Sequence, residues 1–267
     1  MRHDPVPLPA LARLRAVIAA LRTKETGCPW DLEQTRASMA PHLLEETYEA
    51  LEAIEAADDH KTREELGDVL MNVFLIARIA EEDGGFDIET VADTVADKLV
   101  RRHPHVFGDD ATRDPAQVLR NWEAIKRAEA GDDGATGVLA GVPRALPALL
   151  MALRVGEKAS RVGFDWPDQR GPRAKVDEEL AEFDAACAAG DREAIAAELG
   201  DLLFSLANLA RHLDVNPEMA LRACVARFRA RFTRVEEQLR DRLPGATLAE
   251  MEAAWQAAKA TTPPSPT

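Results

Sequence analysis

The chain has 267 residues, of which 46% are hydrophobic, so it is long enough for one large or two ordinary domains with real cores. Its 47 acidic residues outnumber its 33 basic ones, and the resulting net charge of −14 disfavours nucleic acid as a partner. Three widely spaced cysteines fit neither a disulfide framework nor a CxxC zinc site, so we expect a cytoplasmic protein. Because no apolar run reaches the roughly 18 residues of a membrane span, we expect no membrane partner.

The local composition is typical of helices, since Ala, Leu, Glu and Arg dominate and no alternating Val/Ile/Thr segment appears. We therefore expect an all-α fold. Pro41 suits the first turn of one helix, and Thr62 with Glu65 forms a capping box that would start the next. Residues 65–80 place apolar side chains at helical spacing, and the turn between these two helices is expected at residues 56–60.

An internal repeat with a constant shift runs through the chain. The motif EExxE at 45–49 recurs at 178–182, and ELGD at 65–68 recurs at 198–201, each at a shift of 178 − 45 = 133 residues. The repeat predicts two homologous helical domains, at residues 1–130 and 142–260. A glycine-punctuated linker at 131–141 would join them, and a Pro- and Thr-rich disordered tail would follow at 261–267.

In each repeat, four carboxylates are predicted to meet between two antiparallel helices. Residues three or four apart share a helix face, so Glu46 lies with Glu49, and Glu65 lies with Asp68. The pairs 49 with 65 and 46 with 68 both centre on residue 57, in the expected turn, which puts all four at one height, roughly 12 Å from it. In the second repeat the equivalent pairs centre on residue 190, at another turn signal, and gather Glu179, Glu182, Glu198 and Asp201.

Such a cluster has a specific chemical preference. Like charges at this distance repel one another and favour a bound cation. Oxygen ligands without Cys or His select a hard ion, so we expect Mg²⁺ or Mn²⁺ rather than zinc. A di-iron bundle would need Glu-x-x-His pairs, which the sequence lacks, and no GxxxxGK[ST], GxSxG or dinucleotide fingerprint is present.

Several long motifs follow one another in a fixed order. The first half contains GCPWDLEQT, HLLEETYEALEAI, EELGDVLMNVFLIARIAEE, KLVRRHPHVFGD and NWEAIKRAE, and GVPRALPALLMALRVGEKASRVGFDWPD and ELGDLLFSLANLARHL come later. From Gly27 to Lys259 this series resembles the MazG family of nucleoside triphosphate pyrophosphohydrolases. The resemblance implies an all-α fold of the four-helix-bundle type, assembled as a homodimer. It also implies Mg²⁺-dependent hydrolysis of nucleoside triphosphates to the monophosphate and pyrophosphate, with broad base specificity.

The resemblance further implies roles for individual residues. Both sets of four carboxylates would bind metal, and basic and aromatic residues would hold the nucleotide. In the second repeat these are Lys175, Arg227, Arg231, Trp255 and Lys259, and in the first they are Lys98, Arg102, Trp122 and Lys126. Glu178 lies one turn from Glu182, so it is our candidate to orient the attacking water or accept its proton.

The two repeats are not expected to act equally. Lys175 corresponds to His42, and a lysine there is better placed to offset the acids and meet a triphosphate. We therefore expect a catalytic second domain and a structural, regulatory or weakly active first one. The two tryptophans, Trp122 and Trp255, have packing as an equal alternative. Two rival functions stay open, a narrower all-α hydrolase of dUTP or phosphoribosyl-ATP and a non-enzymatic helical adaptor.

Overall fold

The computed structural model describes residues 9–109, 112–130 and 137–261. Across these ranges the chain forms twelve α-helices and one 3₁₀ helix and no strand, which confirms the all-α class. It divides into two compact units, unit 1 (residues 1–131) and unit 2 (residues 132–267). Part of the expected linker, 131–136, and most of the expected tail, 262–267, lie outside the described residues. No described helix combines the length and apolar character needed to cross a membrane.

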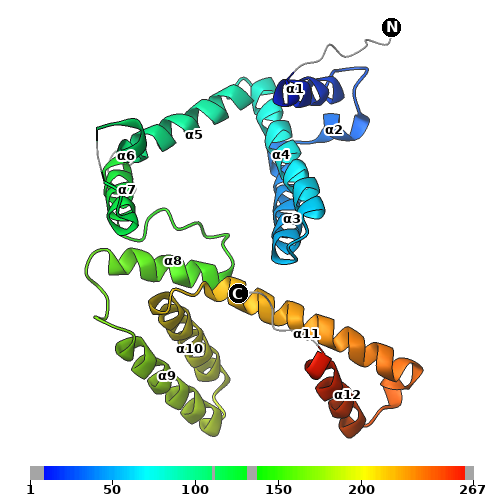
Figure 1. Cartoon of the computed structure of the whole chain (residues 1–267), viewed down its shortest axis with the longest axis vertical. Helices are drawn as coiled ribbons and strands as arrows, with labels where there is room; N and C mark the ends of the chain where they lie inside the picture. The colour runs from blue at the N-terminus through cyan, green and yellow to red at the C-terminus, as the bar shows by residue number, and fades with distance from the viewer. Residues whose placement is uncertain (1–8, 110–111, 131–136, 262–267) are drawn as a thin grey trace. The chain divides into compact units, whose positions relative to one another are not determined.

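Unit 1 is organised around a helical hairpin (Figure 1). Its helices are α1 (Ala10–Leu21), α2 (Pro29–Glu33), α3 (Arg36–Glu55), α4 (Asp59–Glu82), α5 (Ile88–Arg102), α6 (Pro104–Phe107) and α7 (Pro115–Ala130). The hairpin is formed by α3 and α4, α1 packs against α4, and α7 packs against α5. Side chains of α1, α3 and α4 form the core, which contains Ile18, Met39, Phe74, Leu75 and Ile79.

Unit 2 repeats the hairpin. Its helices are α8 (Ala148–Ser160), α9 (Arg170–Ala189), α10 (Arg192–His212), α11 (Pro217–Leu239), the 3₁₀ helix η1 (Arg240–Gly245) and α12 (Leu248–Thr261). The hairpin is formed by α9 and α10, while α8 packs against α10 and α11. A second small core joins α11 to α12 through Val235, Leu239, Ala254 and Ala258.

Both hairpin turns lie where the sequence predicts them. In unit 1 the chain leaves α3 after Glu55 and enters α4 at Asp59. In unit 2, Gly190 ends α9 in the left-handed region with φ of +71°, a conformation that favours glycine. The side chain of Asp191 then accepts the backbone N–H groups of two residues in the first turn of α10. An aspartate therefore caps the second helix of each hairpin, Asp58 in unit 1 and Asp191 in unit 2.

The predicted helix starts in unit 1 are wrong. Thr62 does not begin α4, because Asp58 caps this helix four residues earlier by accepting the N–H of Lys61 at 3.0 Å. Pro41 does not lie in the first turn of α3, because Thr35 forms a capping box with Ser38 and the helix is already under way. In both cases an upstream residue supplied a better cap.

Candidate functional site

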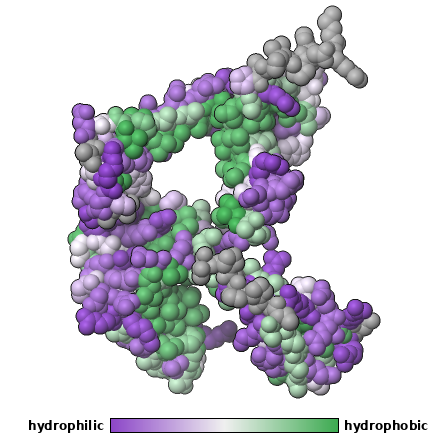
Figure 2. Space-filling view, viewed as in Figure 1, coloured by the Kyte–Doolittle hydropathy of each residue, from purple (hydrophilic) through white to green (hydrophobic). Residues whose placement is uncertain are grey.

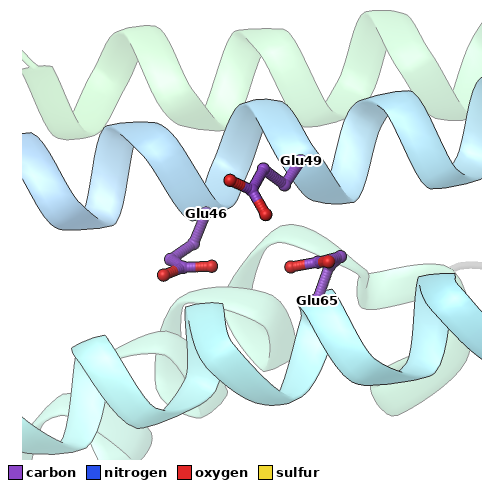
Figure 3. Close-up of side chains that lie close together, drawn as sticks. All are labelled: Glu46, Glu49 and Glu65. Atoms are coloured by element: carbon purple, nitrogen blue, oxygen red, sulfur yellow. The ribbon is translucent and has the colours of Figure 1, made fainter.

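In unit 1, carboxylates of α3 and α4 face one another across the hairpin. Figure 3 shows Glu46 and Glu49 of α3 and Glu65 of α4 pointing toward one another. One oxygen of each lies within 4.8 Å of the others. Burial and then the charge of Asp68, followed by those of the two other cluster glutamates, raise the pKa of Glu46. The hairpin therefore gathers three of the four carboxylates that the repeat singles out, and the fourth, Asp68, is near enough to act on Glu46 through its charge.

Unit 2 gathers the equivalent carboxylates in two overlapping groups that share Glu179. One group joins Glu179 to Glu178 and Glu182 on α9, and the other joins it to Glu198 and Asp201 on α10. Oxygen atoms within each group lie no more than 4.8 Å apart. Desolvation by burial, then the charges of Glu182 and Asp201, raise the pKa of Glu198. Glu178, the candidate base, thus lies within the cluster.

Each cluster contains one lysine, but the two lysines come from different positions. In unit 2, Nζ of Lys175 lies 2.8 Å from an oxygen of Glu178 and 2.5 Å from one of Glu179. These hydrogen bonds raise the pKa of the lysine. In unit 1, Lys61 of α4 forms an ion pair with Glu65. Lys61 was not predicted as a site residue, although its i,i+4 spacing from Glu65 is visible in the sequence.

The donor atoms suit a hard divalent cation. All ligand atoms in these groups are carboxylate oxygens. Mg²⁺ binds oxygen at about 2.0–2.1 Å, so two ligands of one ion lie up to about 4 Å apart. In each group one oxygen of every residue lies within 4.8 Å of the others, so both hairpins are candidate sites for such an ion.

The other residues expected to hold a nucleotide in unit 2 lie on α11 and α12. Arg227 and Arg231 are half-buried on α11, and the Nε of Arg231 is buried without a hydrogen-bond partner in the part of the chain that the structure describes. Trp255 and the exposed Lys259 lie on α12, which packs on the distal part of α11 (Figure 1). The ring of Trp255 lies 5.0 Å from that of Phe228 and against the α11–α12 core. This position fits the packing alternative for the tryptophan.

In unit 1 the corresponding set lies on α5 and α7. The guanidinium carbon of Arg102 lies 5.4 Å from the ring centroid of Trp122, and Arg102 also forms an ion pair with Glu129. Lys98 is half-buried on α5, whereas the side chain of Lys126 lies outside the described residues. Figure 1 shows α7 apart from the α3–α4 hairpin, so the structure groups Arg102 with Trp122 rather than with the carboxylates.

A cavity of about 510 Å³ lies beside the carboxylates of unit 2. Glu179, Asp201 and Lys175 contribute to its lining, as do the aromatic rings of Phe164 and Trp166 from the segment between α8 and α9. The sequence did not predict this cavity, because its walls come from helices whose packing no local pattern specifies. The pairing of an acidic edge with an aromatic wall could be recognised only after folding.

A helical hairpin with an acidic cluster, occurring twice in one chain, defines a class of all-α proteins with tandem acidic sites. Two family models match the sequence of this chain. The MazG nucleotide pyrophosphohydrolase domain matches residues 34–107, in unit 1. The phosphoribosyl-ATP pyrophosphohydrolase model matches residues 152–227, in unit 2. Each matched range contains one of the carboxylate clusters.

Comparison with whole proteins gives the same result. The chain is 42% identical over 252 residues to the nucleoside triphosphate pyrophosphohydrolase of Escherichia coli (strain K12), covering 92% of this chain and 96% of that protein. It is 46% identical to the nucleoside triphosphate pyrophosphohydrolase/pyrophosphatase MazG of Thermotoga maritima, covering 84% of each. It is also 43% identical to the uncharacterized protein YabN of Bacillus subtilis, covering 92% of this chain and 51% of that one. The chain therefore belongs to the MazG family of nucleotide pyrophosphohydrolases, which confirms the resemblance found in its motifs.

Proposed function

We propose that the protein hydrolyses nucleoside triphosphates to the monophosphate and pyrophosphate in a Mg²⁺-dependent reaction of broad base specificity, and that unit 2 is the catalytic unit. The observation that carries this proposal is the position of the α9 and α10 carboxylates at the edge of a cavity of ligand size. The names of the E. coli and T. maritima relatives support the reaction. Mn²⁺ is the alternative ion.

Different side chains of unit 2 would have different roles in this reaction. Four carboxylates would hold the ion, which supplies charge neutralisation of the phosphates and a more acidic water when bound. Lys175, already in contact with the acids, would turn to the triphosphate. Glu178 would accept a proton from the water whose oxygen bonds to the α-phosphorus, while the bond from that phosphorus to the bridging oxygen breaks and pyrophosphate leaves. The carboxylates named as ligands are Glu179, Glu182, Glu198 and Asp201.

A nucleotide panel tests this function. The full chain would be incubated with Mg²⁺ and ATP, GTP, CTP, UTP, dTTP or dUTP, and pyrophosphate would be scored separately from orthophosphate. We expect pyrophosphate from several bases, no reaction in EDTA, and a large loss in Asp201→Asn but not in its counterpart Asp68→Asn. Release of orthophosphate alone, or no release from any nucleotide, would contradict the proposal.

A second candidate substrate is phosphoribosyl-ATP, because the family model that matches residues 152–227 carries that name. The same carboxylates would serve this reaction. Adding phosphoribosyl-ATP to the panel separates the two proposals, since exclusive hydrolysis of that compound, or of dUTP, would replace broad specificity. The adaptor alternative predicts no pyrophosphate and no thermal stabilisation by Mg²⁺ beyond a salt control.

We also propose that the protein forms a homodimer. Both units expose large apolar side chains at equivalent positions, and Figure 2 shows apolar surface along α5 and over the α9–α10 hairpin. Extended apolar patches of this kind mark association surfaces. A mass twice that of one chain, measured by light scattering after gel filtration, is expected, and a monomer at micromolar concentration would contradict it. The equivalent pairs are Leu66 and Leu199, Leu70 and Leu203, Val95 and Phe228, and Leu99 and Phe232.

We further propose a cytoplasmic location. All three cysteines, Cys28, Cys187 and Cys224, are free thiols in the structure, as a reducing compartment would keep them. Cell fractionation should place the protein with cytoplasmic enzymes, and recovery in a membrane or extracellular fraction would contradict this.

A further inference from the structure

The buried carboxylate of unit 1 is paired with a cation of its own helix. Glu65 is 2% exposed, and Figure 3 shows it pointing into the space that it shares with Glu46 and Glu49. Nζ of Lys61, one helical turn earlier on α4, forms an ion pair with Oε1 of Glu65 and lies 3.5 Å from an oxygen of Glu64. An ammonium group bound to a ligand oxygen uses one of its lone pairs and repels a divalent ion. Lys61 therefore competes with a metal for this cluster.

The lysine of unit 2 lies on the opposite side of its cluster. Lys175 precedes its buried partner, Glu179, by four residues of α9, the helix that enters the hairpin turn, so it lies about 6 Å farther from that turn. Lys61 precedes Glu65 by four residues of α4, the helix that leaves the turn, so it lies about 6 Å nearer to the turn. The two lysines therefore approach their clusters from opposite ends.

This difference decides whether the lysine has another anion to bind. Lys175 lines the cavity of unit 2, so a bound triphosphate would give it a new partner and free the oxygen of Glu179. The ion pairs that the structure describes for Lys61 both go to glutamates of its own helix. The charge of Lys61 therefore stays at the unit 1 carboxylates, whereas the charge of Lys175 can move to the substrate.

The sequence exchanges the two lysines between the repeats. The 133-residue shift pairs Lys61 with Ala194, so unit 2 has a methyl group where unit 1 has an ammonium group. The same shift pairs Lys175 with His42, whose ring lies 5.5 Å from that of Trp30. The carboxylates are the same in both repeats, so the lysine position is the difference in charge between the two clusters.

We propose that Lys61 is a tethered cation that occupies the unit 1 carboxylates in place of a divalent ion, and that it makes unit 2 the stronger ion-binding unit. This inference rests on the proposed function, because it takes the carboxylates of both hairpins as metal ligands. The ligands of unit 1 are then intact, and one side chain of the same helix restrains them. Removing that side chain releases a second ion site.

Titration of the full chain with Mn²⁺ in the absence of nucleotide tests this role. Electron paramagnetic resonance would measure the free Mn²⁺ at each step and so give the number of bound ions. We expect about one tightly bound ion per chain in wild type and about two in Lys61→Ala, because loss of the ammonium group should tighten the unit 1 site by about 10-fold or more. Adding Glu46→Gln to Lys61→Ala should remove the gained ion, which would locate it in unit 1.

Further variants test the position of the charge. Ala194→Lys makes the reverse exchange four residues before Glu198, so it should weaken Mn²⁺ binding by unit 2 about 10-fold. The matched controls, Arg63→Ala and Ala196→Arg, change the charge equally at an equivalent pair two residues further along, where the side chain leaves the face of the cluster. Both controls should keep the affinity within about 2-fold. Circular dichroism would establish folding, and Lys61→Gln, which keeps a hydrogen-bond donor without the charge, replaces an alanine variant that does not fold.

The outcomes separate this inference from the proposed function. A gained ion in the Lys61 variant, together with no pyrophosphate release by wild type from any nucleotide, would refute hydrolysis and support the tethered cation. Two equally bound ions in wild type, no gained ion in the folded Lys61 variant, a gained ion that survives Glu46→Gln, or an equal gain in Arg63→Ala would each refute the tethered cation. Pyrophosphate release by wild type would leave hydrolysis standing in all of these cases.

Discussion

Units 1 and 2 carry the same acidic motifs, but the glutamate that is buried stands at a different motif position in each unit. In unit 1 the most buried carboxylate is Glu65 of α4, which pairs with Lys61 on the same helix. In unit 2 it is Glu179 of α9, which pairs with Lys175. These glutamates are not equivalent, since Glu65 corresponds to Glu198. Repetition of a motif therefore preserves the charges without preserving which charge is desolvated or which cation offsets it.

The interiors beside the two hairpins differ in the same way. The core of unit 1 contains Met39 and Leu75, whereas unit 2 has a cavity at the matching positions. A filled interior contributes stability through buried apolar surface, and an open one provides space for a ligand. The proposed function gives unit 1 a supporting role and unit 2 the chemical role, and the following variants test this division.

The largest difference is expected from one glutamine substitution made in each unit. Glu182→Gln removes a proposed metal ligand from unit 2 and should lower kcat/KM for pyrophosphate release by about 1,000-fold, or about 4 kcal/mol. Glu49→Gln makes the equivalent change in unit 1 and should alter the rate by less than about 2-fold. Equal losses in both variants would show that the two units contribute equally to the reaction, which contradicts a supporting role for unit 1.

The candidate base gives a smaller effect. Glu178→Gln keeps the size of the side chain but cannot accept a proton, so kcat should fall by about 100-fold while the Mg²⁺ concentration for half-maximal rate stays within about 2-fold. Glu45→Gln is the matched control in unit 1. An unchanged rate in Glu178→Gln with normal Mg²⁺ dependence would remove the residue from the mechanism.

Alanine substitutions at one pair of equivalent positions should change the free energy of unfolding by different amounts in the two units. Leu75→Ala leaves a hole in the unit 1 core and should lower the free energy of unfolding by about 3 kcal/mol. Asn208→Ala borders an existing cavity and should cost less than about 1 kcal/mol. Urea unfolding followed by circular dichroism measures both. A cost for Asn208→Ala as large as that of Leu75→Ala would place Asn208 in a packed core.

The smallest effect concerns the ion pair that borders the cavity. Hydrogen bonds from Arg211 and, more weakly, from His212 hold the pKa of Asp165 below its ordinary value. A lowered carboxyl pKa stabilises the fold above the ordinary pKa near 3.9, and this contribution is lost as pH falls through the folded-state value. Asp165→Asn should therefore cost about 1–2 kcal/mol at pH 7 and less at about pH 2, which lies below the ordinary carboxyl pKa.

Thermal unfolding at both pH values measures this dependence. Asp184→Asn, on the exposed surface of α9, is the matched control and should change stability by less than about 0.5 kcal/mol at either pH. A cost for Asp165→Asn that does not shrink in acid would mean that the ion pair is not its source.

The sequence predicted the parts of the fold that depend on local signals. Helical periodicity, the repeat and the glycine at 190 place both hairpins and their turns, because each signal acts within a few residues. The two wrong helix starts show the limit of this reasoning, since Asp58 and Thr35 competed successfully as caps. Capping motifs often overlap, and the choice among them depends on which helix length packs best.

The site was predictable to the same extent. The carboxylate clusters follow from arithmetic on helix spacing, and the structure brings those side chains together. Ser205 and Asn208 gave no signal, because a polar residue on a helix is ordinarily solvent-exposed and only the packing of α8 makes these positions part of a cavity. The role of Trp166 in the aromatic wall likewise depends on its contact with Gly171.

Asn72 has a consequence for engineering. Its side-chain nitrogen donates to the carbonyl oxygen of Asp68 at 3.0 Å, but its side-chain oxygen is buried and accepts no hydrogen bond from any described residue. Such an unsatisfied atom costs about 1–3 kcal/mol. Redesign at this residue can therefore raise the thermostability of unit 1 without changing any residue of unit 2, the proposed catalytic unit.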